Sequence, residues 1–264
     1  MSCRIEGTFA LLRRRREKAL IGYLTVGFPT LKALHGLVAG CVEGGMDLLE
    51  LGVPFSDPLA DGPTIQAASQ KALAEGVTPA RILQEVRGLR QRGVELPIIL
   101  MTYYNPVLRY GLERFCREAA ASGVDGLIVP DLPPEEAGEL KSAARSTGLA
   151  TIFLAAPTSS RERLKRIVRA SSGFVYYVSL TGVTGARRKL PREVRGQVRA
   201  LRRMTRLPVC VGFGVSRPEQ VKELAGFADG VIVGSALLDR IGGSGRDAVA
   251  KVRSFVRGLK RACQ

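Results

Sequence analysis

The stretch SGVDGLIVPD, residues 122–131, contains the pattern from which the architecture of this chain follows. It opens with a small residue and a glycine, a common helix end, because glycine adopts the left-handed conformation without strain. An aspartate then leads into a continuous apolar run, which is typical of a parallel strand covered on its outer face. The same order returns in GGMDLLELG, residues 44–52. Both stretches predict a helix that ends on glycine and a buried strand that follows at once.

Short apolar runs of this kind recur eight times, with amphipathic segments between them. Thr78 followed by Pro79 offers a helix cap and a proline in the first turn. Ser159 and Ser216 each precede a glutamate by three positions, which is the spacing of a capping box. The runs are ALIGYLTVG (19–27), MDLLELG (46–52), LPIILMTYY (96–104), VDGLIVPD (124–131), LATIFLAAP (149–157), GFVYYVSL (173–180), LPVCVGFG (207–214) and ADGVIVGS (228–235).

Eight strand–helix units in 264 residues predict an α/β fold of the (β/α)8 TIM-barrel type. A doubly wound open sheet also fits the alternation. However, the turn VGFPTL (26–31) after the first run lacks the glycine fingerprint of dinucleotide-binding sheets. We therefore expect a single TIM-barrel domain over residues 1–264, with a short N-terminal helix at about residues 4–18. In this fold the active site lies at the C-terminal ends of the strands.

Composition limits the possible classes of protein. The five cysteines are odd in number and scattered, which argues against a disulfide framework or a zinc site and fits a reducing cytoplasm. The N-terminus lacks the apolar core of a signal peptide, and no apolar run approaches the roughly 18 residues that span a bilayer. We therefore expect a cytoplasmic protein that does not enter a membrane.

A net charge of +16 raises the question of a nucleic-acid partner. The candidate patches are RRRREK (13–18) and RRKLPREVRGQVRALRRMTR (187–206). Basic residues are spread along the whole chain, however, and no aromatic stacking motif accompanies them. Solvated helix faces explain the patches better, and we expect no nucleic-acid partner.

Carboxylates mark the end of the second apolar run and the loop that follows it. Glu50 lies among leucines, where a carboxylate is costly unless it has a partner or a function. Burial at a strand end should raise its pKa and suit it to proton transfer near neutrality, although an ion pair with an arginine inside the barrel would also explain it. Asp57 before a proline is explained as a turn former. Asp61 stands on the same proline-stiffened loop, which can fold back over the barrel mouth.

The last three strand ends carry glycine clusters, namely TGVTG (181–185), GFGVS (212–216) and GSA (234–236). Bare glycine lets backbone amides approach an anion, and a helix that opens at Ser235 would direct its positive end there. Barrels commonly bind phosphate in the loops after strands seven and eight. Any one cluster could be an ordinary turn, but three consecutive clusters predict a substrate that bears a phosphate.

The other residue types narrow the chemistry. The chain has one histidine, His35, in an expected surface helix, and no lysine occurs in any of the eight runs. Histidine bases, zinc and Schiff-base chemistry are therefore disfavoured. Cys210 lacks a histidine partner and is expected to pack in the core. We predict acid–base catalysis by carboxylates on a small phosphorylated substrate, with no metal and no cofactor.

Several phrases resemble the alpha subunit of tryptophan synthase, in order from about Arg4 to Lys260. The resemblance implies a single barrel that cleaves indole-3-glycerol phosphate to indole and glyceraldehyde 3-phosphate by a retro-aldol reaction. That reaction belongs to the biosynthesis of L-tryptophan. The phrases are RIEGTFA, YLTVGFPT, LELGVPFSDPLADGPTIQ, MTYYNP, PDLPPEE, SLTGVTGAR, GFGVS and VIVGSA.

The resemblance also implies roles for single residues. Glu50 matches the catalytic glutamate that moves protons to the indole ring carbon and from the glycerol hydroxyl. Asp61 matches the aspartate that hydrogen-bonds the indole N–H, and Thr184 matches the loop threonine that engages Asp61 on closure. Tyr23 stands where an apolar aromatic residue is also common in the family. Gly185, Gly214, Gly234 and Ser235 match the phosphate cradle, while Tyr23, Met101, Ile128, Tyr176 and Phe213 match the wall of the indole pocket.

In that family the alpha subunit works beside a beta subunit, which carries pyridoxal phosphate and receives the indole. The resemblance therefore implies a beta-subunit partner, in an α2β2 complex, and contact between it and the loop that carries Asp61. Two alternatives are a stand-alone indole-3-glycerol-phosphate lyase and a catalytically silent chain that only activates its partner. The presence of Glu50, Asp61 and the glycine clusters weighs against the silent chain.

Overall fold

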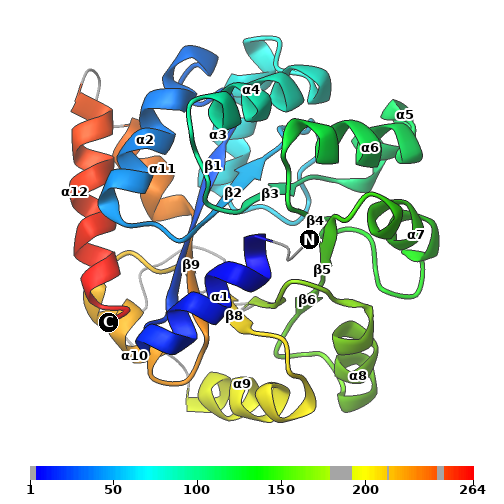
Figure 1. Ribbon diagram of the computed structural model, residues 1–264, viewed down its shortest axis with the longest axis vertical. Coiled ribbons are helices and arrows are strands. Elements are labelled where there is room, and N and C mark those ends of the chain that lie inside the picture. The colour runs from blue at the N-terminus through cyan, green and yellow to red at the C-terminus, as the bar shows by residue number, and fades with distance from the viewer. Residues whose placement is uncertain (1–3, 179–191, 213, 243–246) are drawn as a thin grey trace.

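A computed structural model of the chain describes residues 4–178, 192–212, 214–242 and 247–264. Nine parallel strands form one sheet in the order β5-β4-β3-β2-β1-β9-β8-β7-β6, and the helices surround it (Figure 1). The strands are β1 (Ala19–Thr25), β2 (Leu48–Gly52), β3 (Ile98–Met101), β4 (Gly126–Ile128), β5 (Ala150–Ile152), β6 (Leu154–Ala155), β7 (Val175–Val178), β8 (Val209–Gly212) and β9 (Gly230–Val233).

Helices alternate with these strands along the chain. In the part of the chain that the structure describes, no helix combines the length and the apolar composition that crossing a membrane requires. The helices are α1 (Arg4–Arg15), α2 (Leu34–Gly44), α3 (Pro63–Ala74), α4 (Pro79–Gln91), α5 (Tyr104–Tyr110), α6 (Leu112–Ser122), α7 (Gly138–Ser146), α8 (Arg161–Ala170), α9 (Arg192–Met204), α10 (Pro218–Ala225), α11 (Ser235–Gly242) and α12 (Ala248–Arg261), with a 3-10 turn η1 (Leu31–Ala33) before α2.

The fifth predicted run, residues 149–157, forms two short strands, so the expectation of eight strands is corrected to nine. β5 pairs with β4, while β6 pairs with β7. Phe153 lies between β5 and β6, and its carbonyl oxygen accepts a 3.1 Å hydrogen bond from Tyr176 N. Because one residue joins the two strands, the two ends of the sheet meet and the sheet closes. The predicted (β/α)8 TIM barrel is therefore confirmed.

Two helix starts differ by one residue from the sequence prediction, while the predicted cap of α4 is confirmed. Ser160 caps α8 in place of Ser159, whose hydroxyl instead accepts a 3.1 Å hydrogen bond from Ala156 N in the preceding turn. Arg217 precedes α10 in place of Ser216. Capping-box spacing places a helix start only approximately, because adjacent polar residues compete for the same backbone amides.

The barrel interior is a separate apolar cluster closed at one end by α1. Side chains on a strand alternate between its two faces, so every second residue of each strand points inward. Figure 1 shows α1 lying across the barrel. Ile5, Phe9 and Leu12 of this helix are buried against the inward residues, and the rings of Phe9 and Phe174 are 6.0 Å apart. The other buried members are Ala19, Ile21, Leu48, Ile99, Ile128, Ala150, Ile152, Cys210 and Ile232.

Aspartates at the start of three strands hold the neighbouring strand. In each case the carboxylate accepts the backbone N–H of the first or second residue of the preceding strand. The N–H of the aspartate donates in return to the carbonyl of that residue. The pairs, with these two distances, are Asp47 and Leu20 (2.7 and 3.0 Å), Asp125 and Ile98 (2.8 and 2.8 Å), and Asp229 and Val209 (3.1 and 2.9 Å). The GGMD and SGVD phrases thus join strands as well as end helices.

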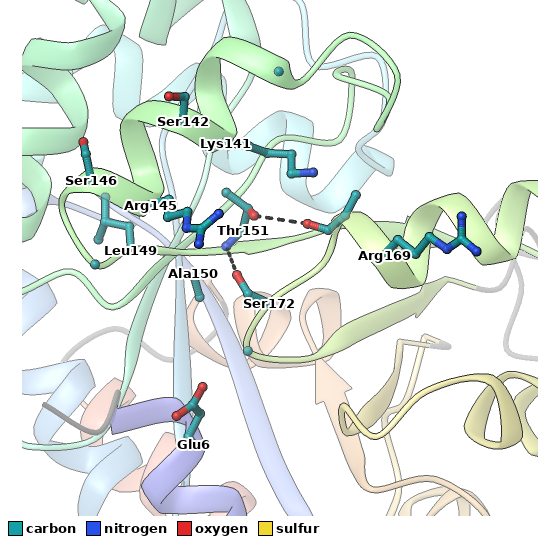
Figure 2. A pocket seen from close by; sticks show the side chains of 14 residues that line it. Glu6, Lys141, Ser142, Arg145, Ser146, Leu149, Ala150, Thr151, Arg169 and Ser172 are labelled. Carbon is teal, nitrogen blue, oxygen red and sulfur yellow. Dashed lines mark hydrogen bonds between the residues drawn. The ribbon is translucent and has the colours of Figure 1, made fainter.

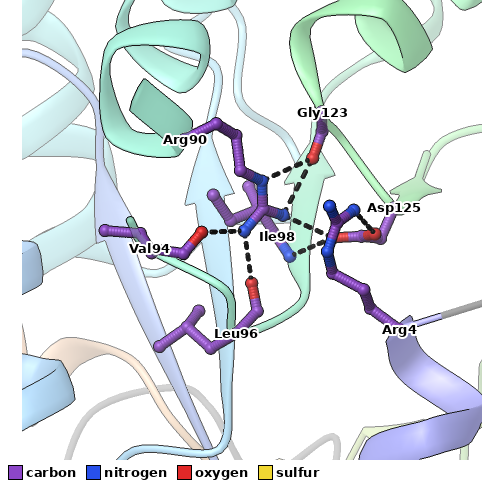
Figure 3. Close-up of polar contacts among 7 residues, drawn as sticks. All are labelled: Arg4, Arg90, Val94, Leu96, Ile98, Gly123 and Asp125. Carbon is purple, nitrogen blue, oxygen red and sulfur yellow. Dashed lines mark hydrogen bonds and ion pairs between the residues drawn. The ribbon is translucent and has the colours of Figure 1, made fainter. Parts of the chain in front are cut away.

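Arginines neutralise Asp125 at the N-terminal end of the barrel (Figure 3). Arg90 of α4 donates to Asp125 Oδ2 at 2.6 Å and to three backbone carbonyls around it. Arg4 of α1 donates to Asp125 Oδ1 at 3.0 Å. The side chains of Asp125 and Arg90 are only 5% and 13% exposed. This group ties α1 and α4 to the starts of β3 and β4.

Candidate active site

Glu50 is buried inside the barrel on β2. Leu48 points inward, so Glu50, two residues later, points the same way. The residue is 1% exposed, and neither carboxylate oxygen has a hydrogen-bond partner among the described residues. Among the described residues, Glu50 therefore does not form the ion pair with an arginine that the sequence left open as an alternative. Burial raises the pKa of Glu50 to about 8, so the carboxyl group holds its proton at neutral pH.

Two tyrosines lie near Glu50 in the same part of the barrel. Tyr23 is its register partner on β1, and Tyr176 lies on β7. Burial raises the pKa of both phenols, and the nearby carboxylates Glu50 and Asp61 raise it further. Both phenols therefore stay neutral and can donate hydrogen bonds. Tyr23 Oη itself accepts a hydrogen bond from Thr25 Oγ1 at 3.4 Å.

Glycines at the ends of β2 and β8 make room for these phenol rings. A Cβ on Gly52 would lie 2.0 Å from Tyr23 Oη. A Cβ on Gly212 would lie 2.7 Å from Tyr176 Oη. Neither separation is possible without movement of a ring or of the strand. The two glycines therefore fix where the phenols lie above the barrel floor.

Asp61 belongs to the loop between β2 and α3, and Tyr103 holds it. Tyr103 Oη donates to Asp61 Oδ2 at 3.1 Å and accepts a hydrogen bond from Ala60 N at 2.9 Å. The ring of Phe55 stacks on that of Tyr103 with centroids 5.1 Å apart. Burial raises the pKa of Asp61 to about 6, while the hydrogen bond from Tyr103 opposes the rise. Asp61 is therefore ionised at neutral pH, in contrast to Glu50.

Tyr103 is a site residue that sequence reasoning missed. It lies 42 positions from Asp61, so no local pattern reveals the contact. The available signal was its place at the end of the third apolar run, in MTYYNP, where a barrel carries functional side chains.

Met101 and Ile128 are register partners at the ends of β3 and β4. Both pack in the interior cluster, which Tyr176 also joins. Ile128 is fully buried, whereas Met101 is partly exposed. Because Met101 is also the register partner of Gly52, the cluster continues toward Tyr23. The structure thus brings together Tyr23, Met101, Ile128 and Tyr176, which the resemblance assigned to one pocket wall.

Gly214, Gly234 and Ser235 follow the ends of two adjacent strands, β8 and β9. Gly214 has a φ of +56°, in the left-handed region that favours glycine. A Cβ there would meet nothing within 4 Å, and a Cβ on Gly234 would meet nothing closer than 3.6 Å. The space beside Gly214 is therefore open, whereas a Cβ on Gly234 would lie at ordinary contact distance from Tyr23 and Ile65. Ser235 begins α11, and the amides of Ser235 and Ala236, ahead of the first amide that donates to the Gly234 carbonyl, suit an anion.

Three predicted site residues, Thr184, Gly185 and Phe213, lie outside the residues that the structure describes. Their assignment stays a prediction from the resemblance. Cys210, by contrast, is fully buried in the interior cluster, as predicted, and burial raises the pKa of its thiol. Within the described ranges no three side chains of the metal-binding types are grouped to hold an ion.

Fold and site together define a barrel enzyme suited to acid–base chemistry, with one neutral carboxyl group on β2 and one ionised carboxyl group on the loop that follows it. The profile of the family described as tryptophan synthase alpha chain matches residues 9–264. Proteins of that description from Geotalea daltonii and Geobacter sulfurreducens are 49% and 50% identical over 258 and 262 residues, covering 97% and 98% of both chains.

Solved structures agree with the sequence comparison. The tryptophan synthase subunit alpha from Legionella pneumophila superposes with a TM-score of 0.93 at 38% identity, covering 100% of this chain and 99% of that one. The chain therefore belongs to the tryptophan synthase alpha chain family, whose members cleave indole-3-glycerol phosphate, a lyase reaction in tryptophan biosynthesis.

Replacing Gly52 by alanine should displace the Tyr23 ring, because the added methyl group needs the space of its phenol. A shift of about 1 Å near reacting groups is enough to lower a rate about 100-fold. We expect Gly52→Ala to lower kcat/KM for indole release by roughly 10- to 100-fold. Gly7→Ala on α1 is the matched control, since a Cβ there meets nothing within 4 Å. Unchanged activity of the Gly52 variant in steady-state assays would show that Tyr23 does not shape the site.

Proposed function

We propose that Glu50 and Asp61 carry out the cleavage of indole-3-glycerol phosphate, with Glu50 transferring protons and Asp61 stabilising charge. The observation that supports this most directly is the burial of Glu50 with no hydrogen-bond partner among the described residues. A buried polar group without a partner lowers stability, so its presence is best explained by a ligand that completes its interactions.

Glu50 can serve as acid and then as base within one turnover. Its raised pKa means that the carboxyl group begins protonated and can donate to C3 of the indole ring. The resulting carboxylate then takes the proton of the glycerol hydroxyl on the carbon attached to C3. As that hydroxyl becomes an aldehyde, the carbon–carbon bond breaks and its electron pair returns to the indole ring. Indole and glyceraldehyde 3-phosphate leave, and Glu50 is protonated again.

Asp61 acts on the charge that this sequence develops. Protonation of C3 places positive charge on the indole nitrogen, and an ionised carboxylate that accepts the N–H hydrogen bond stabilises it. Because the pKa of Asp61 is about 6 and that of Glu50 is about 8, Asp61 is ionised and Glu50 is protonated between these two pH values. Tyr103 positions the carboxylate through its 3.1 Å hydrogen bond. Since the protonated indole ring accepts the electron pair, these steps require no cofactor of the alpha chain.

The remaining residues bind the two ends of the substrate. We assign the indole to the pocket lined by Tyr23, Met101, Ile128 and Tyr176, with Phe213 as a further wall. We assign the phosphate to Gly214, Gly234 and Ser235 together with Gly185, and loop closure to Thr184. The open space beside Gly214 and the start of α11 support the phosphate assignment.

A beta subunit is the partner that membership of the family implies, and we propose an α2β2 complex in which that subunit holds pyridoxal phosphate. Leu59, on the loop that carries Asp61, is 93% exposed and offers an apolar contact to the partner. Contact at this loop would also adjust the position of Asp61. We further propose one catalytic domain over residues 1–264 and a reducing cytoplasm, which the free buried cysteines Cys41, Cys116, Cys210 and Cys263 favour.

The pH profile of kcat/KM should have two limbs. Asp61 must be ionised, so activity should rise through about pH 6, and Glu50 must be protonated, so activity should fall through about pH 8. Asp61→Asn should lower kcat/KM roughly 10- to 100-fold, the loss of one charge-assisted hydrogen bond, and remove the acid limb. The control is Asp57→Asn, exposed on the same loop, which should keep both limbs. An acid limb that persists near pH 6 in Asp61→Asn would assign that ionisation to another group.

Indole release by the purified chain, measured alone and with a beta subunit, tests the function as a whole. Weak activity alone and strong stimulation by the beta subunit are expected, because contact at the Asp61 loop would order the site. Fast turnover without the beta subunit would favour the stand-alone lyase. No indole in either condition, with the beta reaction still accelerated, would favour a silent activator.

A further inference from the structure

At four places in the barrel, before β2, β4, β7 and β9, a side chain and its own backbone N–H make two hydrogen bonds to the start of an earlier strand. We call each such pair of hydrogen bonds a clasp, and one of the four clasps differs from the others. In three of them the side chain that joins neighbouring strands is an aspartate, before β2, β4 and β9. In the fourth, Ser172 makes the same two hydrogen bonds, although it lies three residues before β7, whereas each aspartate directly precedes its strand. Ser172 Oγ accepts a hydrogen bond from Thr151 N at 2.8 Å, and Ser172 N donates to the carbonyl of Thr151 at 2.8 Å. Ser172 thus makes the same two hydrogen bonds as the three aspartates, but it carries no negative charge.

Each aspartate is paired with a cation near the C-terminal end of a helix; for Asp125 and Asp229 this helix directly precedes the first strand of the pair, whereas for Asp47 it is α12, the last helix of the chain. The pairs are Asp47 with Lys260 of α12 (2.9 Å), Asp125 with Arg90 of α4 (2.6 Å) and Asp229 with Arg202 of α9 (2.9 Å). The corresponding helix for Ser172 is α7, and its second-to-last residue is Arg145. Arg90 and Lys260 are likewise second to last in their helices. Arg145 therefore occupies the place of the paired cation.

Arg145 has no counter-charge at this clasp, because the clasp contains a serine and no aspartate. It forms no ion pair with any residue in the described ranges, unlike the three cations of the other clasps. A hydroxyl group can accept the strand N–H, but it cannot neutralise a guanidinium. The fourth clasp is thus complete in its backbone hydrogen bonds and incomplete in its charge.

A cleft of about 950 Å³ opens at this clasp. Figure 2 shows Arg145 of α7 extending toward Thr151, Lys141 of the same helix extending toward α8, and Arg169 on α8 with its guanidinium directed away from both. Glu6 of α1 is the one carboxylate among the described residues that line the cleft, so the lining keeps a net positive charge. The hydroxyl-bearing residues Ser142, Ser146, Ser172 and Thr151 and backbone from Gly138, Gly148 to Ala150, Ala170 and Gly173 complete it.

We propose that this cleft binds a phosphate group, in inorganic phosphate or a small phosphate monoester, between Arg145 and Lys141. The phosphate supplies the negative charge that an aspartate supplies in the other three clasps. The guanidinium, ammonium and hydroxyl donors that line the cleft match its several acceptor oxygens. The cleft lies at the N-terminal ends of β5 and β7, whereas the catalytic loops follow the C-terminal ends of the strands. It is therefore a second anion site, separate from the substrate site.

A backbone amide NMR titration with inorganic phosphate separates the two sites. Amides of Thr151 and Ser172 report on the cleft, while those of Gly234 and Ser235 report on the catalytic side. We expect saturable shifts at the cleft amides, with affinity at least tenfold weaker in Lys141→Gln/Arg145→Gln/Arg169→Gln. The matched control removes three exposed arginines elsewhere, Arg81→Gln/Arg87→Gln/Arg92→Gln, and should leave the affinity at the cleft unchanged. Repeating the titration with glycerol 3-phosphate shows whether the ester or the free ion binds more tightly.

Ser172→Asp restores the clasp that the other three strand pairs have. We expect it to abolish phosphate shifts at Thr151 and to raise the Tm, because the new carboxylate pairs with Arg145 and occupies the place of the anion. Three results would overturn the proposal: no saturable shift at the cleft amides of the wild type, equal weakening in both triple variants, or phosphate binding by Ser172→Asp as tight as that of the wild type. Each is independent of indole release, so failure here leaves the catalytic assignment intact.

Discussion

Replacing Glu50 by glutamine is expected to lower kcat for indole release by about 10²- to 10⁴-fold, the usual contribution of a general acid–base group. Glutamine keeps the size of the side chain and can donate a hydrogen bond, but it can neither give a proton to the indole ring nor take one from the glycerol hydroxyl. KM should change little, because the phosphate and indole contacts remain. The measurement is steady-state indole release with the beta subunit present.

The same variant should be folded and, at alkaline pH, more stable than the wild type. The pKa of Glu50 is raised from 4.5 in the unfolded chain to about 8 in the folded one. The folded state therefore holds a proton that the unfolded state releases between these values. Through that window the free energy of unfolding of the wild type falls as pH rises, by up to about 1.4 kcal/mol per pH unit. Glu50→Gln lacks this loss, so the stability difference should grow from about pH 5 to pH 8.

Glu136→Gln is the matched control for Glu50, because the same chemical change is made at an exposed position with no strand contact. It should leave both turnover and the pH dependence of stability unchanged. Turnover of Glu50→Gln within a few-fold of the wild type, in a chain that unfolds cooperatively, would remove Glu50 from the chemistry.

The largest effect on stability is expected from Arg90→Met, which leaves the buried Asp125 without its closest cation. Removing one partner of a buried ion pair typically lowers stability by about 3 to 5 kcal/mol, because the other charge stays desolvated. Three backbone carbonyls also lose their donor. Arg4 stays near Asp125, but its half-exposed side chain compensates only in part. Urea unfolding followed by circular dichroism measures the loss.

Arg114→Met provides the comparison for Arg90. Arg114 pairs with Glu118 one turn away on the surface of α6, at 2.7 Å, and an exposed pair of this kind contributes little to stability. The kcat of the folded Arg90 variant should match the wild type, since the clasp lies at the end of the barrel away from Glu50. Equal losses of stability for Arg90 and Arg114 would mean that the Asp125 clasp does not hold the barrel.

Residue patterns were sufficient to predict those strands and site residues that depend on local or periodic interactions. Continuous apolar runs located the strands, because parallel strands are covered on both faces. Glu50 was visible as a carboxylate among leucines at the end of such a run, and Asp61 as an acid on a proline-stiffened loop. The roles of both residues and of the pocket residues came from resemblance to a family. Sequence spacing misplaced the starts of α8 and α10 by one residue, where neighbouring side chains compete for the same amides.

Contacts between distant residues needed the folded chain. At Phe153 the pairing passes from β4 on one side to β7 on the other, which no run of residues displays. Tyr103 and Asp61 meet across 42 positions, and the aspartate clasps join strand starts to cations on separate helices. Asp125 was visible before its strand, but its partners Arg90 and Arg4 were not.

By itself, then, the sequence determined the barrel, its strands and the two carboxylates at its mouth. These depend on hydrophobic periodicity and on the cost of placing charge among leucines, both of which are properties of neighbouring residues. Only the tertiary structure decided which carboxyl group is neutral and which is ionised. The pKa of each depends on how completely the group is buried and on which side chains donate hydrogen bonds to it. The same holds for Ser172 and Arg145, whose missing charge is evident only beside the three complete clasps.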